Sequence, residues 1–64
     1  MKMLEMTKKV LENVSFDKTL FKKELKKATK WLKKEELMLL QAWCFTKFGE
    51  RYQDLINEVF NQLN

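Results

Sequence analysis

The sequence contains no histidine and no proline, and it has one glycine and one cysteine among its 64 residues. Without histidine, the chain lacks the commonest general base near neutral pH and the usual partner of a nucleophilic serine or cysteine. A single glycine cannot build a glycine-rich phosphate loop. One cysteine allows no disulfide within the chain, and one thiol without histidine argues against a tetrahedral zinc site. We therefore expect no enzymatic activity, no cofactor, no metal and no small-molecule substrate.

The shortage of glycine and proline also bears on the fold class. Strand hairpins and long loops depend on such residues, so the sequence favours an all-α protein. A chain of 64 residues holds one domain at most, and a domain of this size buries only about 60% of the surface of its unfolded chain. We expect residues 1–64 to form a single helical domain of marginal stability, which self-association would supplement.

Apolar residues at helical spacing divide the chain into four segments, at about residues 3–14, 18–32, 35–48 and 50–63. Asp17 is a suitable N-cap for the second segment, and Phe16 and Phe21 are placed for a hydrophobic staple. Gly49 stands where a left-handed cap would end the third segment. The apolar arc of the first segment comprises Met3, Leu4, Met6, Val10, Leu11 and Val14.

The third segment is apolar on nearly all sides, so other helices must cover it. We therefore expect a small bundle of three to four short helices packed around the third. The boundary at residues 33–35 has no glycine or proline. A short turn there is favoured because two lysines precede two glutamates, and each pair complements the dipole of the adjacent helix end. A continuous helix through to residue 48 is the alternative.

Lysine is the most unevenly distributed residue. Residues 17–34 hold eight lysines against two acidic residues, a net charge of +6, whereas residues 35–64 hold two basic and five acidic residues, a net charge of −3. At about 100° per residue, all eight lysines fall within one half of a helical wheel. Such a face can steer an anionic partner or orient one copy of the protein against another. The candidate residues for an anionic partner are Lys22, Lys23, Lys26, Lys30 and Lys33.

This lysine face has three interpretations. A solvated face that keeps a small protein in solution is the simplest, and a surface for an acidic protein partner comes second. The third is a phosphate-binding surface for nucleic acid or anionic lipid. It is less favoured because the face has no arginine, asparagine or glutamine for reading base edges, and no aromatic residue interleaved for base stacking.

Large apolar side chains supply a second candidate surface. Tryptophan is enriched at binding hot spots and methionine at adaptable surfaces, although at helical spacing both usually belong to the core. A chain this short has difficulty covering two tryptophans and a third segment that is apolar all round. We expect an apolar interface that uses Leu40, Trp43, Met38 and Trp31. The methionine-bearing first segment would add contact area to it.

Several single residues have ordinary structural interpretations. Cys44 is expected in the core as a small hydrophobic residue. Glu24 is expected at the edge of an apolar stripe, paired with Lys27. The acidic residues of the fourth segment recur every four positions, which suits a solvated face better than a site for a hard cation; they are Glu50, Asp54 and Glu58.

The longest apolar run, residues 37–40, is far shorter than the ~20 residues that span a bilayer. The first fourteen residues are interrupted by charges, unlike the apolar part of an export signal. A free thiol fits a reducing compartment. The sequence therefore predicts a cytoplasmic, non-enzymatic interaction or regulatory module that binds a protein partner or a second copy of itself. A sequence-tolerant nucleic-acid-binding protein is the alternative.

Overall fold

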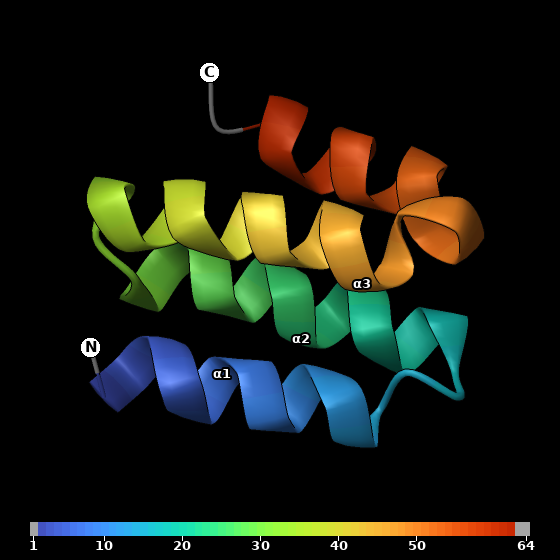
Figure 1. Cartoon of the computed structure of the whole chain (residues 1–64), viewed down its shortest axis with the longest axis horizontal. Coiled ribbons are helices and arrows are strands. Elements are labelled where there is room, and N and C mark those ends of the chain that lie inside the picture. The colour runs from blue at the N-terminus through green and yellow to red at the C-terminus, as the bar shows by residue number, and fades with distance from the viewer. Residues whose placement is uncertain (1, 63–64) are drawn as a thin grey trace.

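The computed structural model describes residues 2–62, which form three α-helices and no strand: α1 (Lys2–Asn13), α2 (Lys18–Trp31) and α3 (Lys34–Asn61). α1 and α2 are antiparallel neighbours joined by a short turn, and α3 contacts both of them (Figure 1). The predicted all-α fold is confirmed.

α3 changes direction within its length. The backbone of Tyr52 leaves the helical region, at φ −126° and ψ 27°, and the chain folds back there along the first half of the helix (Figure 1). The two segments expected at 35–48 and 50–63 are therefore the two halves of α3, and Leu63 lies outside the described residues. The predicted left-handed cap at Gly49 is wrong, because Gly49 has no positive φ and lies inside the helix.

The contacts of Tyr52 account for the position of this reversal. Its ring is buried and lies 4.8 Å from the ring of Phe21, measured between centroids. Its hydroxyl donates a hydrogen bond of 2.6 Å to the carbonyl of Ser15, in the turn between α1 and α2. The kink is thus held by tertiary contacts with distant parts of the chain rather than by a local turn residue.

The other helix boundaries follow from capping. The Asp17 carboxylate accepts hydrogen bonds from the backbone N–H groups of Thr19 and Leu20, which confirms Asp17 as the N-cap of α2. α2 ends at Trp31, and the extended residues Leu32 and Lys33 separate it from α3. The alternative of one continuous helix is therefore wrong.

The predicted staple at the start of α2 buries little surface, because the Phe16 side chain is 74% exposed. Phe21 is instead buried against the rings of Phe48 and Tyr52.

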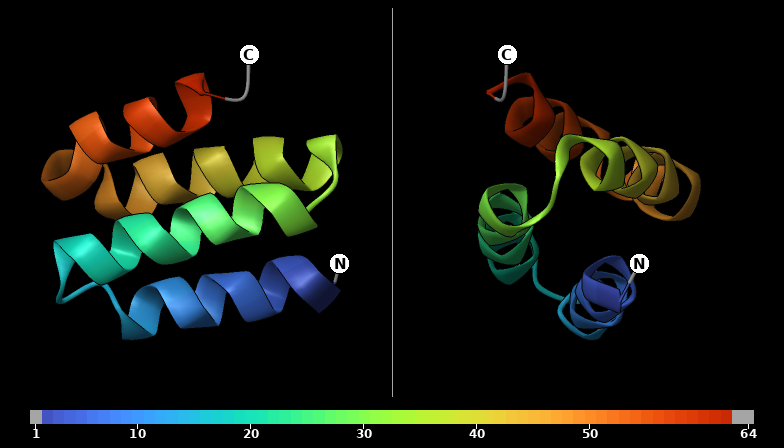
Figure 2. Two further views of the ribbon diagram at one scale, coloured as in Figure 1. Left: turned by 180° about the vertical axis from the view of Figure 1, so that it is seen from behind. Right: turned by 90° about the vertical axis from the view of Figure 1, so that its left-hand side faces the viewer.

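The core lies between the three helices and takes its largest share from α3, which supplies seven of the thirteen apolar residues that are buried among residues 2–62. No polar or charged side chain is buried within residues 2–62. α1 supplies only Leu4 and Leu11. The second half of α3 and α1 lie on opposite sides of the molecule, as its two further views make clear (Figure 2). The buried set is Leu4, Leu11, Phe21, Leu25, Ala28, Leu32, Leu40, Cys44, Tyr52, Leu55, Ile56, Val59 and Phe60.

Candidate functional site

The lysine face of α2 points mostly to solvent. Lys23, Lys26, Lys30 and Lys33 are exposed. Lys22 differs, because its ammonium group lies 2.9 Å from the carboxylate of Glu58 on the second half of α3. The hydrogen bond and the charge of Lys22 hold the pKa of Glu58 below its usual value. Four of the five predicted lysines are therefore free to meet a partner, whereas Lys22 links α2 to α3.

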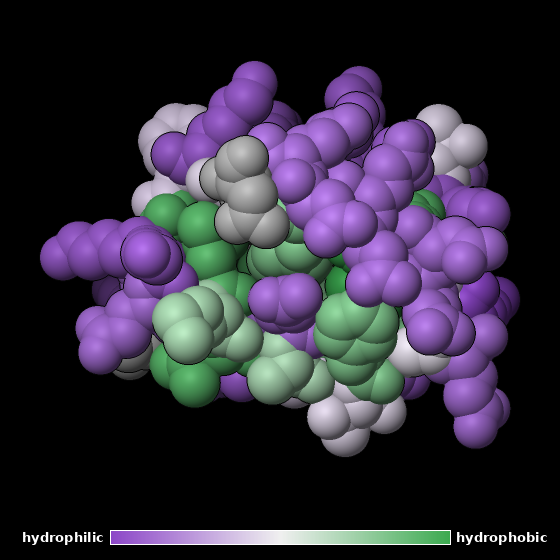
Figure 3. Space-filling view, turned by 90° about the horizontal axis from the view of Figure 1, so that it is seen from above, coloured by the Kyte–Doolittle hydropathy of each residue, from purple (hydrophilic) through white to green (hydrophobic). Residues whose placement is uncertain are grey.

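The four residues predicted for an apolar interface differ in how far they are exposed. Leu40 is fully buried in the core, so it cannot contact a partner. Trp43 is half-buried. Its ring packs edge to face with the ring of Phe48, with 5.5 Å between the two centroids. Met38 is 65% exposed and Trp31 is 69% exposed, on different helices. Apolar surface between hydrophilic side chains is visible where α3 is seen from above (Figure 3).

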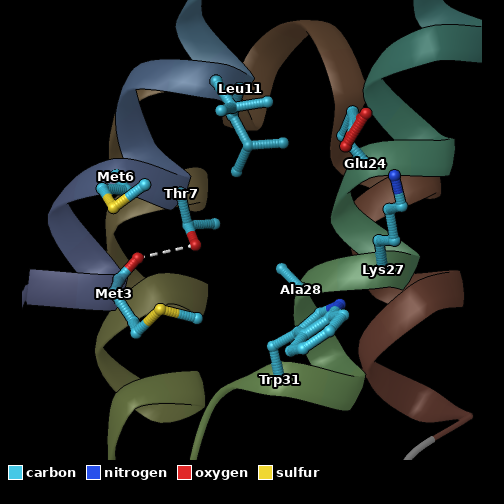
Figure 4. A pocket seen from close by; sticks show the side chains of 9 residues that line it. Met3, Met6, Thr7, Leu11, Glu24, Lys27, Ala28 and Trp31 are labelled. Carbon is cyan, nitrogen blue, oxygen red and sulfur yellow. Dashed lines mark hydrogen bonds between the residues drawn. The ribbon is translucent and has the colours of Figure 1, made fainter.

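The structure adds a feature that sequence reasoning missed, an apolar groove between α1 and α2. Its volume is about 360 Å³. The lining residues follow one another at intervals of one or three along each helix, so each helix contributes one stripe about two turns long. α3 runs behind the two walls (Figure 4). The lining residues are Met3, Met6, Thr7, Val10 and Leu11 from α1, and Glu24, Lys27, Ala28 and Trp31 from α2.

The two ends of the groove are lined by different residues. Because α1 and α2 are antiparallel, the start of α1 lies beside the end of α2. Met3 lies opposite Trp31 at one end, whereas Leu11 and Glu24 lie at the other (Figure 4). The Thr7 hydroxyl donates a hydrogen bond of 2.8 Å to the carbonyl of Met3, so it is already satisfied within α1. The surface offered along the groove is therefore mainly apolar.

The walls of the groove hold half of the large apolar side chains that the described residues leave exposed. Burial of apolar surface is the main favourable term in association, and single exposed apolar residues are ordinary whereas a contiguous set marks a contact surface. The exposed fractions are 46% for Met3, 56% for Met6, 41% for Val10 and 69% for Trp31.

Lysines border the groove on both sides. On a helical wheel, Lys2 and Lys9 lie near Met6 on the side of α1 away from the core. On α2, Lys27 lies next to Trp31, and Lys23 lies one turn before Lys27 on the same side. All four lysines are exposed.

Glu24 is the only acidic residue in the lining, and it is half-buried. Its predicted ion pair with Lys27 is not among the ion pairs of residues 2–62, which join Lys22 to Glu58 and Lys47 to Glu12.

The remaining candidate groups have structural roles. Cys44 is buried, and its burial raises the pKa of the thiol to about 12, so its predicted place in the core is confirmed. Glu50, Asp54 and Glu58 are exposed. Within residues 2–62, no three side chains of the metal-binding types gather closely enough to hold an ion. In that same part of the chain, every helix is too short or too polar to cross a membrane.

The groove went unrecognised in the sequence because its α1 residues belong to one continuous apolar arc. The methionines of that arc were expected to supply contact area, but the arc alone does not show that only Leu4 and Leu11 are buried or that α2 forms a second wall beside it. The available signal was the width of the arc, which exceeds what one neighbouring helix can cover.

Comparisons of the chain with known protein families, curated proteins and solved structures find no match.

Proposed function

We propose that this protein is a small, non-enzymatic protein–protein interaction module whose contact surface is the groove between α1 and α2. The exposed walls of that groove, formed by Met3, Met6, Val10 and Trp31, carry the proposal. Tryptophan in such a position is a typical hot spot, and unbranched methionine adapts its shape to a partner. The lysines beside the groove steer an anionic partner toward it.

The chemistry of the described residues supports a binding role over catalysis. The groove offers no cysteine, and its one hydroxyl is bonded within α1. Cys44, the only thiol in the chain, is buried with a pKa raised to about 12, far from the thiolate that a nucleophile requires. A free thiol is typical of a reducing compartment, and we propose a cytoplasmic location on that basis.

Site-specific photo-crosslinking in cells tests this function. Met6 in the groove is replaced by photoreactive benzoylphenylalanine, and Phe16 in the turn between α1 and α2, which is 74% exposed and does not line the groove, serves as the matched control position. We expect defined protein adducts from position 6 and not from position 16. Adducts are identified by mass spectrometry, and the partner is then purified and titrated against the purified chain.

The titration compares Trp31→Ala with Phe16→Ala, since both remove an exposed aromatic ring but only Trp31 lines the groove. Trp31→Ala should weaken binding by about tenfold or more, the scale of a hot-spot residue. Phe16→Ala should leave the affinity unchanged. Equal affinities for the two variants, or no partner crosslinked at position 6, contradict the proposal.

Sequence-tolerant nucleic-acid binding is the second candidate function, favoured by four exposed lysines on one face: Lys23, Lys26, Lys30 and Lys33. Lysine contacts to phosphate give an affinity that falls steeply with salt. Filter-binding titrations with duplex and single-stranded DNA and RNA decide the matter. Absence of binding at about 50 mM salt removes this function.

Self-association is an alternative in which α3, and not the groove, supplies the contact surface. Met38 and Leu39 on its first half are 65% and 49% exposed. Light scattering of the purified chain across salt concentrations measures the mass of the particles in solution. A mass equal to that of one chain at every salt concentration excludes self-association.

A further inference from the structure

We infer that the groove between α1 and α2 takes a single amphipathic helix of another protein, one that carries acidic residues on both sides of its apolar stripe. This inference rests on the proposed function and specifies the chemistry of the partner.

The shape of the groove fits one helix. Two antiparallel helices with an apolar groove between them offer the seat in which a further helix packs, with its side-chain ridge between theirs. The α1 stripe runs from Met3 to Leu11, about 12 Å at 1.5 Å per residue. That length matches about two turns of a partner, whose apolar anchors would stand at positions i, i+3 or i+4, and i+7.

The charge around the groove determines which helix fits. Residues 2–34 hold eleven lysines against four acidic residues, a net charge of +7. Lysines stand along both edges, Lys2 and Lys9 on α1 and Lys23 and Lys27 on α2. A helix seated in the groove brings the residues beside its apolar stripe close to these lysines. Acidic residues there are attracted and basic residues are repelled, which affects specificity and association rate more than affinity.

A second copy of this chain is a poor occupant. Two grooves facing each other would bring together two surfaces of the same strong positive charge. The acidic residues of the chain concentrate in α3, but the apolar face of its second half is buried in its own core, including Leu55, Ile56 and Val59. The first half of α3 exposes only two large apolar side chains, Met38 and Leu39. The occupant that satisfies both the apolar floor and the lysine edges is therefore a helix from another protein.

Two synthetic helices test this inference against the full-length chain. Each has about 18 residues, long enough to hold helical structure, and the same leucine stripe. One has glutamate at the positions beside the stripe, and the other has lysine there. Calorimetric titration at about 50 mM salt should show at least about tenfold tighter binding of the glutamate helix. That preference should shrink as salt is raised, because exposed charges are screened.

Paired variants locate the binding site. Trp31→Ala and Lys27→Glu alter the groove, whereas Phe16→Ala and Lys34→Glu make the same kinds of change at exposed positions outside it. The first pair should weaken binding of the glutamate helix by about tenfold and about threefold respectively, and the second pair should leave it unchanged. Circular dichroism confirms that each variant keeps the helical content of the parent chain.

Several results overturn the inference. They are equal affinity for the two helices, no binding of either, binding that survives Trp31→Ala, and light scattering that shows the groove closed by a second copy. Preferential binding of anionic vesicles or of DNA through the groove residues also overturns it. If an identified protein still crosslinks at position 6 and depends on Trp31, the interaction function stands and only the chemistry of the partner is wrong. If no partner crosslinks there, the proposed function itself fails.

Discussion

α1 and the second half of α3 are both short amphipathic helices, but they bury their apolar faces to different extents. The second half of α3 buries five apolar side chains, because the reversal at Tyr52 presses it against the first half and α2. α1 buries only Leu4 and Leu11 and leaves Met3, Met6 and Val10 more than 40% exposed. The comparison shows that most of the buried apolar side chains belong to α2 and α3, whereas α1 leaves much of its apolar face exposed. That exposed face is the surface for which we propose a partner.

The largest expected effect separates the core of α2 and α3 from the face of α1. Phe21→Ala should lower the free energy of unfolding by about 3–5 kcal/mol, because Phe21 is fully buried against Phe48 and Tyr52. A domain of this length has a total stability of only about 3–10 kcal/mol. Met6→Ala, on the exposed face of α1, should change stability by about 0.5 kcal/mol or less.

Urea denaturation followed by circular dichroism measures both variants. Comparable losses from the two substitutions would contradict the division between a stabilising core and an exposed apolar face that adds little to stability.

An intermediate effect is expected at the reversal of α3. Tyr52→Phe removes the hydroxyl that donates to the Ser15 carbonyl and should destabilise the protein by about 1–2 kcal/mol. Because that bond ties α3 to the turn between α1 and α2, its loss should also speed amide hydrogen exchange in that turn. Unchanged stability and unchanged exchange would mean that ring packing alone holds the kink.

The smallest expected effect concerns specificity rather than stability. Glu24 is the one acidic group lining the groove, so it opposes an acidic partner helix. Glu24→Gln should tighten binding of the glutamate helix by about two- to fivefold, the scale of one exposed charge interaction. Binding of the lysine helix should weaken. Glu35→Gln makes the same change at an exposed site outside the groove and should have no effect on either.

The sequence predicted the helices well because their signals are local. Apolar spacing located each helical segment, and Asp17 marked the start of α2 to the residue. The positive charge and the exposure of the lysine face were also predictable, because a core of this size cannot bury eight charged ammonium groups. Cys44 was placed correctly in the core because its neighbours along the helix are apolar.

The errors arose where distant parts of the chain decide the outcome. Gly49 looked like a helix end, but the chain reverses at Tyr52, where contacts with Phe21 and Ser15 hold the backbone. Leu40 was assigned to an interface although it is buried, and the groove that α2 forms with α1 beside Met6 was not predicted. A helical wheel shows which residues share a face, but it does not show how much of that face a neighbouring helix covers.

The unlike ends of the groove have a consequence for the orientation of whatever lies in it. Trp31 and Met3 stand at one end and Glu24 stands at the other. A seated helix has a positive N-terminus and a negative C-terminus, and a carboxylate favours the positive one. Glu24 would therefore draw the N-terminus toward itself and set the C-terminus beside Trp31. The groove would thus distinguish a sequence from its reversed copy.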